Sequence, residues 1–308
     1  MKILGIIQRN SEISLRKIGI AAGLNSPGFK VIRSPYPGIL WENYSVGDVI
    51  DYIHILNNRV SHGLNANREN YSVGDVIDYI QTAIRENVVD SLLVEPVLGE
   101  GGYVVPPEGF LKALRKLCDE NNIIMIVDEV QAGMGRTGKM WAFEHDGIKP
   151  DIVCAGKSVG GGIPMSLVYY RGDFDEKLPT PFHLGTYRAN PLALAAGKEV
   201  LKRTPAVLDS VKERGKYLLK AFGDIDSDVI AQVRGKGFMI GIELGKNGRP
   251  VDSNTMAKYK KLLIENGLIM HTCGHYGNTF RFMGALNIDQ KLLDTGVQIF
   301  EKVVRTKW

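Results

Sequence analysis

Apolar residues in the middle of the chain form short continuous runs, separated by a stretch with helical spacing. The runs VDSLLVE at residues 89–95, IIMIV at 123–127, DIVCA at 151–155 and LVYY at 167–170 predict buried strands. After the first run, FLKALRKLCDENN at residues 110–122 has apolar positions spaced as in a helix and ends in two asparagines. Strands of this kind alternating with helices predict an α/β unit with a mainly parallel sheet.

The pattern changes after Pro191. PLALAAGKEVLKR, VLDSVKERGKYLLKAF and DQKLLDTGVQIFEKVV predict three helices. GFMIGIEL at residues 237–244 alternates like a half-buried strand, and LIMHTC and TFRFM predict two short strands. We therefore expect a large domain over residues 1–200 and a smaller α+β domain over residues 201–308, joined through the helices around residues 191–215.

The twelve residues ENYSVGDVIDYI occur twice, at residues 42–53 and 69–80, with an offset of 27 residues and identity at every position. Both copies place apolar residues along one helical face. In the second copy these are Val73, Val76, Ile77, Ile80 and Ile84. Two perfect copies without a third do not indicate a repeat protein. We interpret residues 42–68 as a duplicated insert, from a tandem duplication or an assembly artefact, and the second copy as the helix that leads into the strand at 89–95.

Composition and charge narrow the function classes. The chain has 308 residues, of which 44% are hydrophobic and 23% charged, as in an ordinary soluble globular protein. No apolar run approaches the ~18–20 residues of a membrane span, and the N-terminus has no signal-peptide pattern. The net charge of +4 is spread along the chain, so nucleic acid is not indicated. Cys118, Cys154 and Cys273 form no metal or disulfide pattern and the six histidines have no ligand spacing, so we expect no metal and a cytoplasmic location.

Two glycine-rich stretches match nucleotide-binding loops only in part. GMGRTG at residues 133–138 fits GxGxxG, but five residues separate it from the preceding strand, and KMWAFEHDG does not resemble a diphosphate-binding helix. The same stretch fits most of a Walker A loop, except that Met140 replaces the magnesium-binding hydroxyl residue. In AGKS at residues 155–158, Asp151 stands where the first loop glycine belongs. We therefore reject a nucleotide site.

Asp128 and Lys157 each follow a predicted strand and are 29 residues apart, which is enough for a parallel crossover. Both then lie at the carboxyl edge of the sheet, where ligand crevices form in α/β folds. A salt bridge explains such a pair. A pyridoxal-phosphate site explains it as well, since a lysine binds that cofactor covalently and a carboxylate keeps its ring nitrogen protonated. The geometry alone leaves both interpretations open.

Four longer stretches resemble the class III pyridoxal-phosphate aminotransferases, which include the 4-aminobutyrate, ornithine and acetylornithine enzymes. The stretches are VEPVLGEGGYVVPPEGF, IIMIVDEVQAGMGRTGKMWAFEH, PDIVCAGKSVGGGIPMS and GTYRANPLALAA. The resemblance runs from about residue 90 to residue 308, and RGKGFMIGIEL and NTFRFMGALNI also stand in the family's places. It implies a fold type I pyridoxal-phosphate transferase, with pyridoxal 5'-phosphate as cofactor.

The resemblance also implies the cofactor-binding residues. Lys157 matches the lysine that binds pyridoxal phosphate, and Asp128 matches the partner of the pyridine nitrogen. Gln131 matches the residue near the phenolic oxygen of the cofactor. Thr186 matches a threonine that reaches the cofactor phosphate of the neighbouring subunit, which implies a homodimer with shared active sites.

Two further residues match substrate-binding positions of the family. Arg281 matches the arginine that binds the substrate carboxylate, a task that suits its planar guanidinium. Glu100 matches the glutamate that pairs with this arginine and shields it when a second substrate binds. The resemblance thus implies transamination between an amino acid, such as 4-aminobutyrate or an ornithine-like donor, and a 2-oxo acid.

Residues 1–40 contain neither the SGTEAN-like phosphate loop of the family nor its aromatic-His-Gly segment. We therefore expect the chain to begin part-way through the large domain. One alternative is then a truncated, catalytically impaired homologue. Another is an amino-acid racemase or aminomutase, because one fold supports several reactions.

Overall fold

The structure is a computed structural model and describes residues 3–4, 73–86, 91–174, 176 and 188–306. The chain divides into two compact units. The first unit consists of Met1–Pro96, Pro106–Gln131 and Phe143–Lys202, and the second of Val97–Val105, Ala132–Ala142 and Arg203–Trp308. Two inner segments, Val97–Val105 and Ala132–Ala142, thus belong with the C-terminal unit, and the expected domains over residues 1–200 and 201–308 stay a prediction. The proposed insert at residues 42–68 lies outside the described residues.

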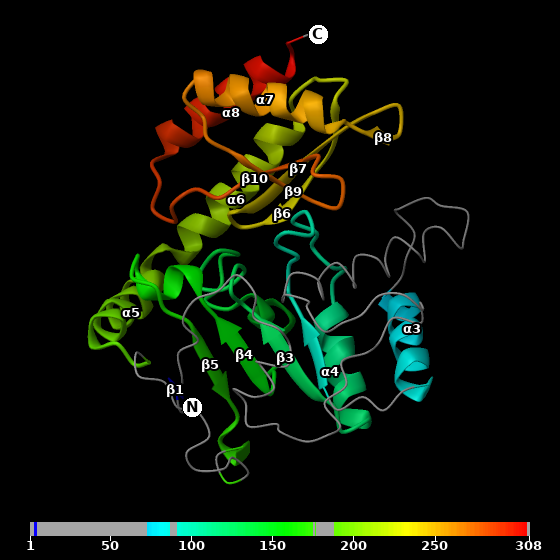
Figure 1. The fold of residues 1–308 in the computed structure, drawn as a ribbon, viewed down its shortest axis with the longest axis vertical. Coiled ribbons are helices and arrows are strands. Elements are labelled where there is room, and N and C mark those ends of the chain that lie inside the picture. The colour runs from blue at the N-terminus through cyan, green and yellow to red at the C-terminus, as the bar shows by residue number, and fades with distance from the viewer. Residues whose placement is uncertain (1–2, 5–72, 87–90, 175, 177–187, 307–308) are drawn as a thin grey trace. The chain divides into compact units, whose positions relative to one another are not determined.

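The first unit contains a five-stranded sheet with the order β1-β5-β4-β3-β2 (Figure 1). The strands are β1 Ile3–Leu4, β2 Ser91–Val94, β3 Ile124–Asp128, β4 Ile152–Ala155 and β5 Leu167–Tyr170. β2, β3 and β4 run parallel, as predicted. However, β5 is antiparallel to β4, and β1 is antiparallel to β5, so the sheet is mixed. The reversal follows from the short connection at residues 156–166, because a parallel crossover needs a dozen or more residues.

In the described part of this unit, the α-helices are α3 Val73–Glu86, α4 Phe110–Glu120 and α5 Pro191–Arg203, of which the last residue belongs to the second unit. The second copy of the repeat therefore begins a helix, as predicted, whereas the first copy lies outside the described residues. The apolar faces of α3 and α4 pack together with β2 and β3 around one core. Its buried residues include Ile80 from α3, and Phe110, Leu111, Leu114 and Leu117 from α4.

The start of α4 is capped from a distant part of the chain. Gly109 precedes the helix and has no side chain that can accept a hydrogen bond. Instead, Asp146 accepts one from the backbone N–H of Leu111, with 2.9 Å between Oδ2 and N. Asp146 ends the short 3-10 helix Ala142–Asp146, so this contact ties the segment after β3 to the helix before it. A carboxylate at a helix N-terminus also interacts favourably with the helix dipole.

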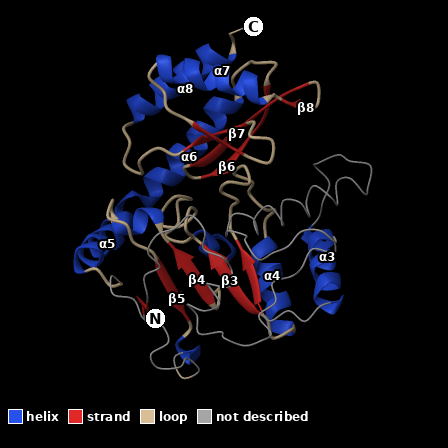
Figure 2. Ribbon diagram, viewed as in Figure 1, coloured by secondary structure: helices blue, strands red, loops and turns tan. Residues whose placement is uncertain are grey.

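The second unit is an antiparallel sheet with the order β6-β7-β10-β9, on which three helices pack (Figure 2). The strands are β6 Ile230–Lys236, β7 Met239–Lys246, β9 His271–Cys273 and β10 Thr279–Phe282, and the two-residue β8 Arg249–Pro250 pairs with β7. The helices are α6 Leu208–Gly223, α7 Ser253–Glu265 and α8 Gln290–Val304. Phe222, Phe280 and Phe300 meet edge to face in the core. None of the helices described in the two units is long and apolar enough to cross a membrane.

Candidate active site

Asp128 and Lys157 lie at the same edge of the sheet in the first unit. Asp128 is the last residue of β3, and Lys157 begins the 3-10 helix Lys157–Gly160 directly after β4. β3 and β4 are adjacent and parallel, with Asp128 opposite Cys154. The carboxyl ends of both strands therefore bring the acid and the amine to one place, which is the sheet edge that the sequence predicted.

The Asp128 carboxylate is buried, with only 5% of the residue exposed. Its Oδ1 accepts a hydrogen bond from the backbone N–H of Val130 at 2.9 Å. Burial raises the pKa of Asp128, although the Val130 N–H and the positive charge of Lys157 oppose this effect. Because burial disfavours the charged carboxylate, a nearby cation stabilises it. A protonated ring nitrogen is such a cation.

The Lys157 amine is exposed and held by a side chain from the loop after β3. Its Nζ donates to Oε1 of Gln131 at 2.8 Å. Lys157 has a left-handed backbone with φ of 48°, which is uncommon for a side chain of this size. The resemblance implies a place for Gln131 near the phenolic oxygen of the cofactor, and in the structure its side chain contacts Lys157 directly.

Helix α5 supports the segment after Lys157 through a close backbone approach at Gly197. A Cβ at Gly197 would lie 3.0 Å from the carbonyl oxygen of Val159 and 2.7 Å from Cε of Met165. Glycine therefore allows α5 to pack directly on the 3-10 turn that begins with the lysine. This packing restricts the positions that the lysine backbone can adopt.

Arg281 and Glu100 meet in the second unit. Arg281 lies on β10, opposite Gly241 of β7 and His271 of β9, and its Nη1 donates to Oε1 of Glu100. The Arg281 side chain is 14% exposed and that of Glu100 is 59% exposed. Burial lowers the pKa of Arg281, but the hydrogen bond and negative charge of Glu100 outweigh it, so the pKa is raised. The guanidinium is therefore a permanent cation, shielded on one side by an exposed carboxylate.

Within the described part of the chain, Arg281 Nε is buried and has no hydrogen-bond partner. This leaves donor capacity on the guanidinium beyond the contact with Glu100. Thr186, the remaining predicted site residue, lies outside the described residues.

The GMGRTG stretch, rejected above as a nucleotide loop, is a packed turn of the second unit. The backbone N–H of Phe238 donates to the carbonyl of Arg136 at 2.8 Å, and Nη1 of Arg136 donates to the carbonyl of Gly284 at 2.5 Å. The next helical segment is the five-residue 3-10 helix Ala142–Asp146. The stretch therefore does not lead into a helix that could bind a diphosphate.

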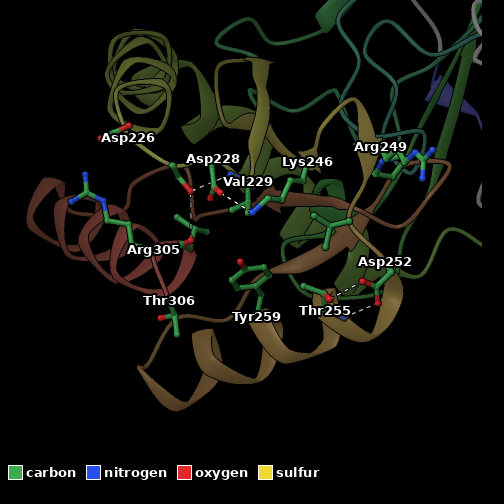
Figure 3. A pocket seen from close by; sticks show the side chains of 14 residues that line it. Asp226, Asp228, Val229, Lys246, Arg249, Asp252, Thr255, Tyr259, Arg305 and Thr306 are labelled. Atoms are coloured by element: carbon green, nitrogen blue, oxygen red, sulfur yellow. Dashed lines mark hydrogen bonds and ion pairs between the residues drawn. The ribbon is translucent and has the colours of Figure 1, made fainter. Parts of the chain in front are cut away.

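A surface hollow of about 960 Å³ lies elsewhere in the second unit (Figure 3). Three of its charged side chains are engaged in the fold: Nζ of Lys246 donates to Oδ2 of Asp228 at 2.8 Å, and Asp252 caps α7. None of the predicted site residues lines it. Among the described residues, His, Cys, Asp and Glu form no group of three or more that could hold a metal ion.

Residues 46–304 match the family model of the class-III aminotransferases. The chain belongs to this family. It is 37% identical over 226 residues to a diaminobutyrate–2-oxoglutarate aminotransferase of Haemophilus influenzae, with 70% of this chain and 50% of the relative aligned. It is also 37% identical over 223 residues to a leucine/methionine racemase of Thermococcus litoralis, with the same coverage.

A solved amine transaminase from an uncultivated Pseudomonas species, in its pyridoxal-phosphate-bound form, superposes with a TM-score of 0.70 at 26% identity. The match covers 75% of this chain and 56% of that structure. This class-III aminotransferase thus spans about half the length of the curated relatives it matches.

The family depends on pyridoxal phosphate, and the residues of the first unit fit this cofactor. The fit rests on the chemistry of the donor set. Lys157 offers an exposed amine beside an amide oxygen, and Asp128 offers a buried carboxylate whose charged form calls for a cation.

Proposed function

We propose that this class-III aminotransferase transfers an amino group from an amino acid, such as 4-aminobutyrate or an ornithine-like diamino acid, to a 2-oxo acid. The observation that carries the proposal is the pair of adjacent parallel strands β3 and β4: Asp128 ends β3, and Lys157 lies two residues after the end of β4. The relative from H. influenzae, which acts on diaminobutyrate and 2-oxoglutarate, supports a diamino donor and a dicarboxylate acceptor.

Each site residue then has a role that follows from its environment. Pyridoxal phosphate, when bound, supplies an electron sink for the substrate α-carbon. Asp128 holds the ring nitrogen in its cationic form, because a buried carboxylate is stabilised by an adjacent positive charge. Gln131 orients the lysine through the 2.8 Å contact, and Lys157 Nζ carries a proton to and from the α-carbon.

Arg281 binds a substrate carboxylate with its guanidinium, which is cationic at every physiological pH. Glu100 competes for the same guanidinium, so it occupies Arg281 while a substrate without that carboxylate is bound. The proposal includes a homodimer, in which Thr186 contacts the cofactor phosphate of the partner subunit. The free, buried thiols of Cys118, Cys154 and Cys273 support a reducing compartment such as the cytoplasm.

The proposal is tested by adding pyridoxal phosphate to the purified chain and reducing it with borohydride. We expect a yellow protein with a covalent cofactor adduct on the peptide that contains Lys157. Lys157→Ala should abolish the adduct, whereas Lys149→Ala, at an exposed lysine of the same unit, should not. Transamination from an ω-amino donor to 2-oxoglutarate should follow the same pattern. A protein that stays colourless and unlabelled is instead the impaired homologue.

A racemase is the second candidate, because the T. litoralis relative is one. Both reactions use a lysine for proton transfer at the α-carbon, so the site geometry does not separate them. Incubation of the cofactor-loaded chain with one L-amino acid and no oxo acid decides the question. Formation of the D-amino acid identifies a racemase, and its absence alongside transamination excludes one.

A further inference from the structure

Three strands of the second unit place two arginines on either side of a glycine. Arg234 of β6 lies opposite Gly241 of β7, and Gly241 lies opposite Arg281 of β10. Directly paired residues of antiparallel strands point to the same face of a sheet. Arg234 and Arg281 therefore share one face, with a gap between them where Gly241 has no side chain.

The loop that carries Glu100 fills this gap. A Cβ at Gly241 would lie 3.0 Å from the carbonyl oxygen of Gly102 and 3.1 Å from Cβ of Tyr103. Tyr103 is fully buried, with a left-handed backbone at φ of 56°. The loop backbone therefore sits directly on the sheet, and glycine at position 241 leaves room for this approach, because a Cβ there would crowd the loop.

Arg234 holds the loop in place from one side. Its Nε donates to the carbonyl of Gly102 at 2.9 Å, and its Nη1 donates to Oε2 of Glu243 at 2.5 Å. Both charged side chains of this pair are only 14% exposed, so the guanidinium is anchored on the sheet while it grips the loop. The turn Gly99–Gly102 closes with a 3.2 Å backbone bond, so the Gly102 carbonyl is two residues from Glu100.

Glu100 is held from the other side. Its carbonyl accepts a hydrogen bond from the backbone N–H of Gly274 at 2.8 Å, and its carboxylate binds Arg281. With Gly102 bound to Arg234, the backbone is held at the carbonyl of Glu100 and again two residues later. Only the Glu100 side chain, which is 59% exposed, is then free to move between Arg281 and solvent.

We propose that Arg234 is a positioning residue that holds the Glu100 loop on the sheet and so determines how far Glu100 shields Arg281 from carboxylate ligands. The role of Arg281 in this statement rests on the proposed function. The contacts that Arg234 makes with the loop are independent of the proposed function. The pairing of Glu100 with Arg281 is independent of it as well.

The test measures the reactivity of Arg281 with phenylglyoxal in the cofactor-free chain, followed by peptide mass spectrometry. Glu100→Gln should raise the modification rate of Arg281 by up to about fivefold, since the Glu100 partner of the lost ion pair is 59% exposed and such pairs contribute at most about 1 kcal/mol. Arg234→Lys keeps a positive charge for Glu243 but loses the fork that also reaches Gly102, and should raise the rate to a similar level. The double variant should be no faster than Glu100→Gln alone, because both changes remove the same shield.

Arg249→Gln, at an exposed arginine on β8 of the same unit, is the matched control and should leave the rate at the wild-type value. Arg234→Gln combined with Glu243→Gln removes the buried pair together and replaces Arg234→Lys if that variant does not fold. The proposal is overturned if Arg281 reacts at the wild-type rate in the folded Arg234 variants, or if Glu100→Gln has no effect. It is also overturned if the increases in the Arg281 modification rate from the two single substitutions multiply in the double variant. Because no cofactor or turnover is involved, a failed transamination assay leaves this result unaffected.

Discussion

Asp151 connects three elements of the first unit and provides a direct test of how its sheet is held together. The residue immediately precedes β4 and is 4% exposed. Its Oδ2 accepts hydrogen bonds from the backbone N–H of Met125 on β3 at 2.7 Å and from Nη1 of Arg115 on α4 at 2.6 Å. Its Oδ1 pairs with Nη1 of Arg171, which follows β5, at 2.6 Å. One carboxylate thus joins two strands, a helix and the residue after a third strand.

The loss expected from Asp151→Ala can be estimated contact by contact. The buried N–H of Met125 is left without its side-chain acceptor, which costs about 1–3 kcal/mol. Arg115, with a side chain 13% exposed, loses its buried partner, and breaking such a pair costs about 3–5 kcal/mol. Arg115 keeps a second pair with Asp119, so the lower end applies. Arg171 is 53% exposed and contributes less than about 1 kcal/mol. We expect a total of about 4–7 kcal/mol.

Two further substitutions calibrate this value. Asp151→Asn keeps an oxygen for the Met125 N–H but removes the charge, so we expect a smaller loss of about 2–3 kcal/mol. Asp173→Asn removes a carboxylate that pairs with Arg171 at the surface, and should cost less than about 1 kcal/mol.

The assay is native-state hydrogen exchange of the β3 and β4 amides, because a chain with two units does not guarantee one cooperative transition. The loss of exchange free energy should decrease in the order Asp151→Ala, Asp151→Asn, Asp173→Asn. The reasoning is refuted if Asp151→Ala lies within about 1 kcal/mol of the wild-type chain.

Three other changes have defined outcomes. In the cofactor-free chain, burial raises the pKa of Asp128, so the folded state disfavours its charged form, and stability falls as the pH rises above the unfolded value of about 3.9. Asp128→Asn removes this dependence, and denaturation at pH 5 and pH 8 should show the variant gaining stability relative to wild type at the higher pH. Asp146→Ala removes the distant cap on Leu111 and should cost about 1 kcal/mol in the exchange of α4 amides, whereas an unchanged α4 would contradict the capping role. Gly241→Ala forces a methyl group against Gly102 and should cost about 1–3 kcal/mol in thermal unfolding while raising the phenylglyoxal reactivity of Arg281. If Gly241→Ala is destabilised but its Arg281 reacts with phenylglyoxal at the wild-type rate, the substitution does not displace the loop.

The elements that sequence patterns predicted are those with a continuous or strongly periodic apolar face. β3 and β4 are buried along nearly their whole length, and α4 buries residues at helical spacing, so the order of apolar and polar residues identifies these elements. The direction of β5 was not predicted, since it depends on the length of the connection and not on the strand's own residues. β6 and α7 were missed. β6 is largely half exposed and lacks an apolar run, and α7 buries only Met256, Tyr259 and Leu263 between lysines.

In the candidate site, too, the sequence pattern predicts some of the contacts between residues and not others. Asp128 and Lys157 could be placed together because parallel strands bring their carboxyl ends to one edge, whatever the rest of the fold. Glu100 and Arg281 are 181 residues apart, and no local pattern connects them. Their pairing depends on a loop from the middle of the chain packing on the C-terminal sheet, so only the resemblance pointed to it.

Arg234 begins the stretch RGKGFMIGIEL, but its role depends on the strand register, which the sequence pattern of this stretch does not determine. The register is set by the turn Gly237–Phe238, which joins Lys236 directly to its partner Met239. Gly237 has φ of 58°, and a Cβ there would lie 2.5 Å from the carbonyl carbon of Thr137, so the turn accepts only glycine. A register shift of one residue would move Arg234 to the opposite face of the sheet, away from Gly102. The glycines of this segment thus determine which face the arginine occupies, and therefore which loop it can hold.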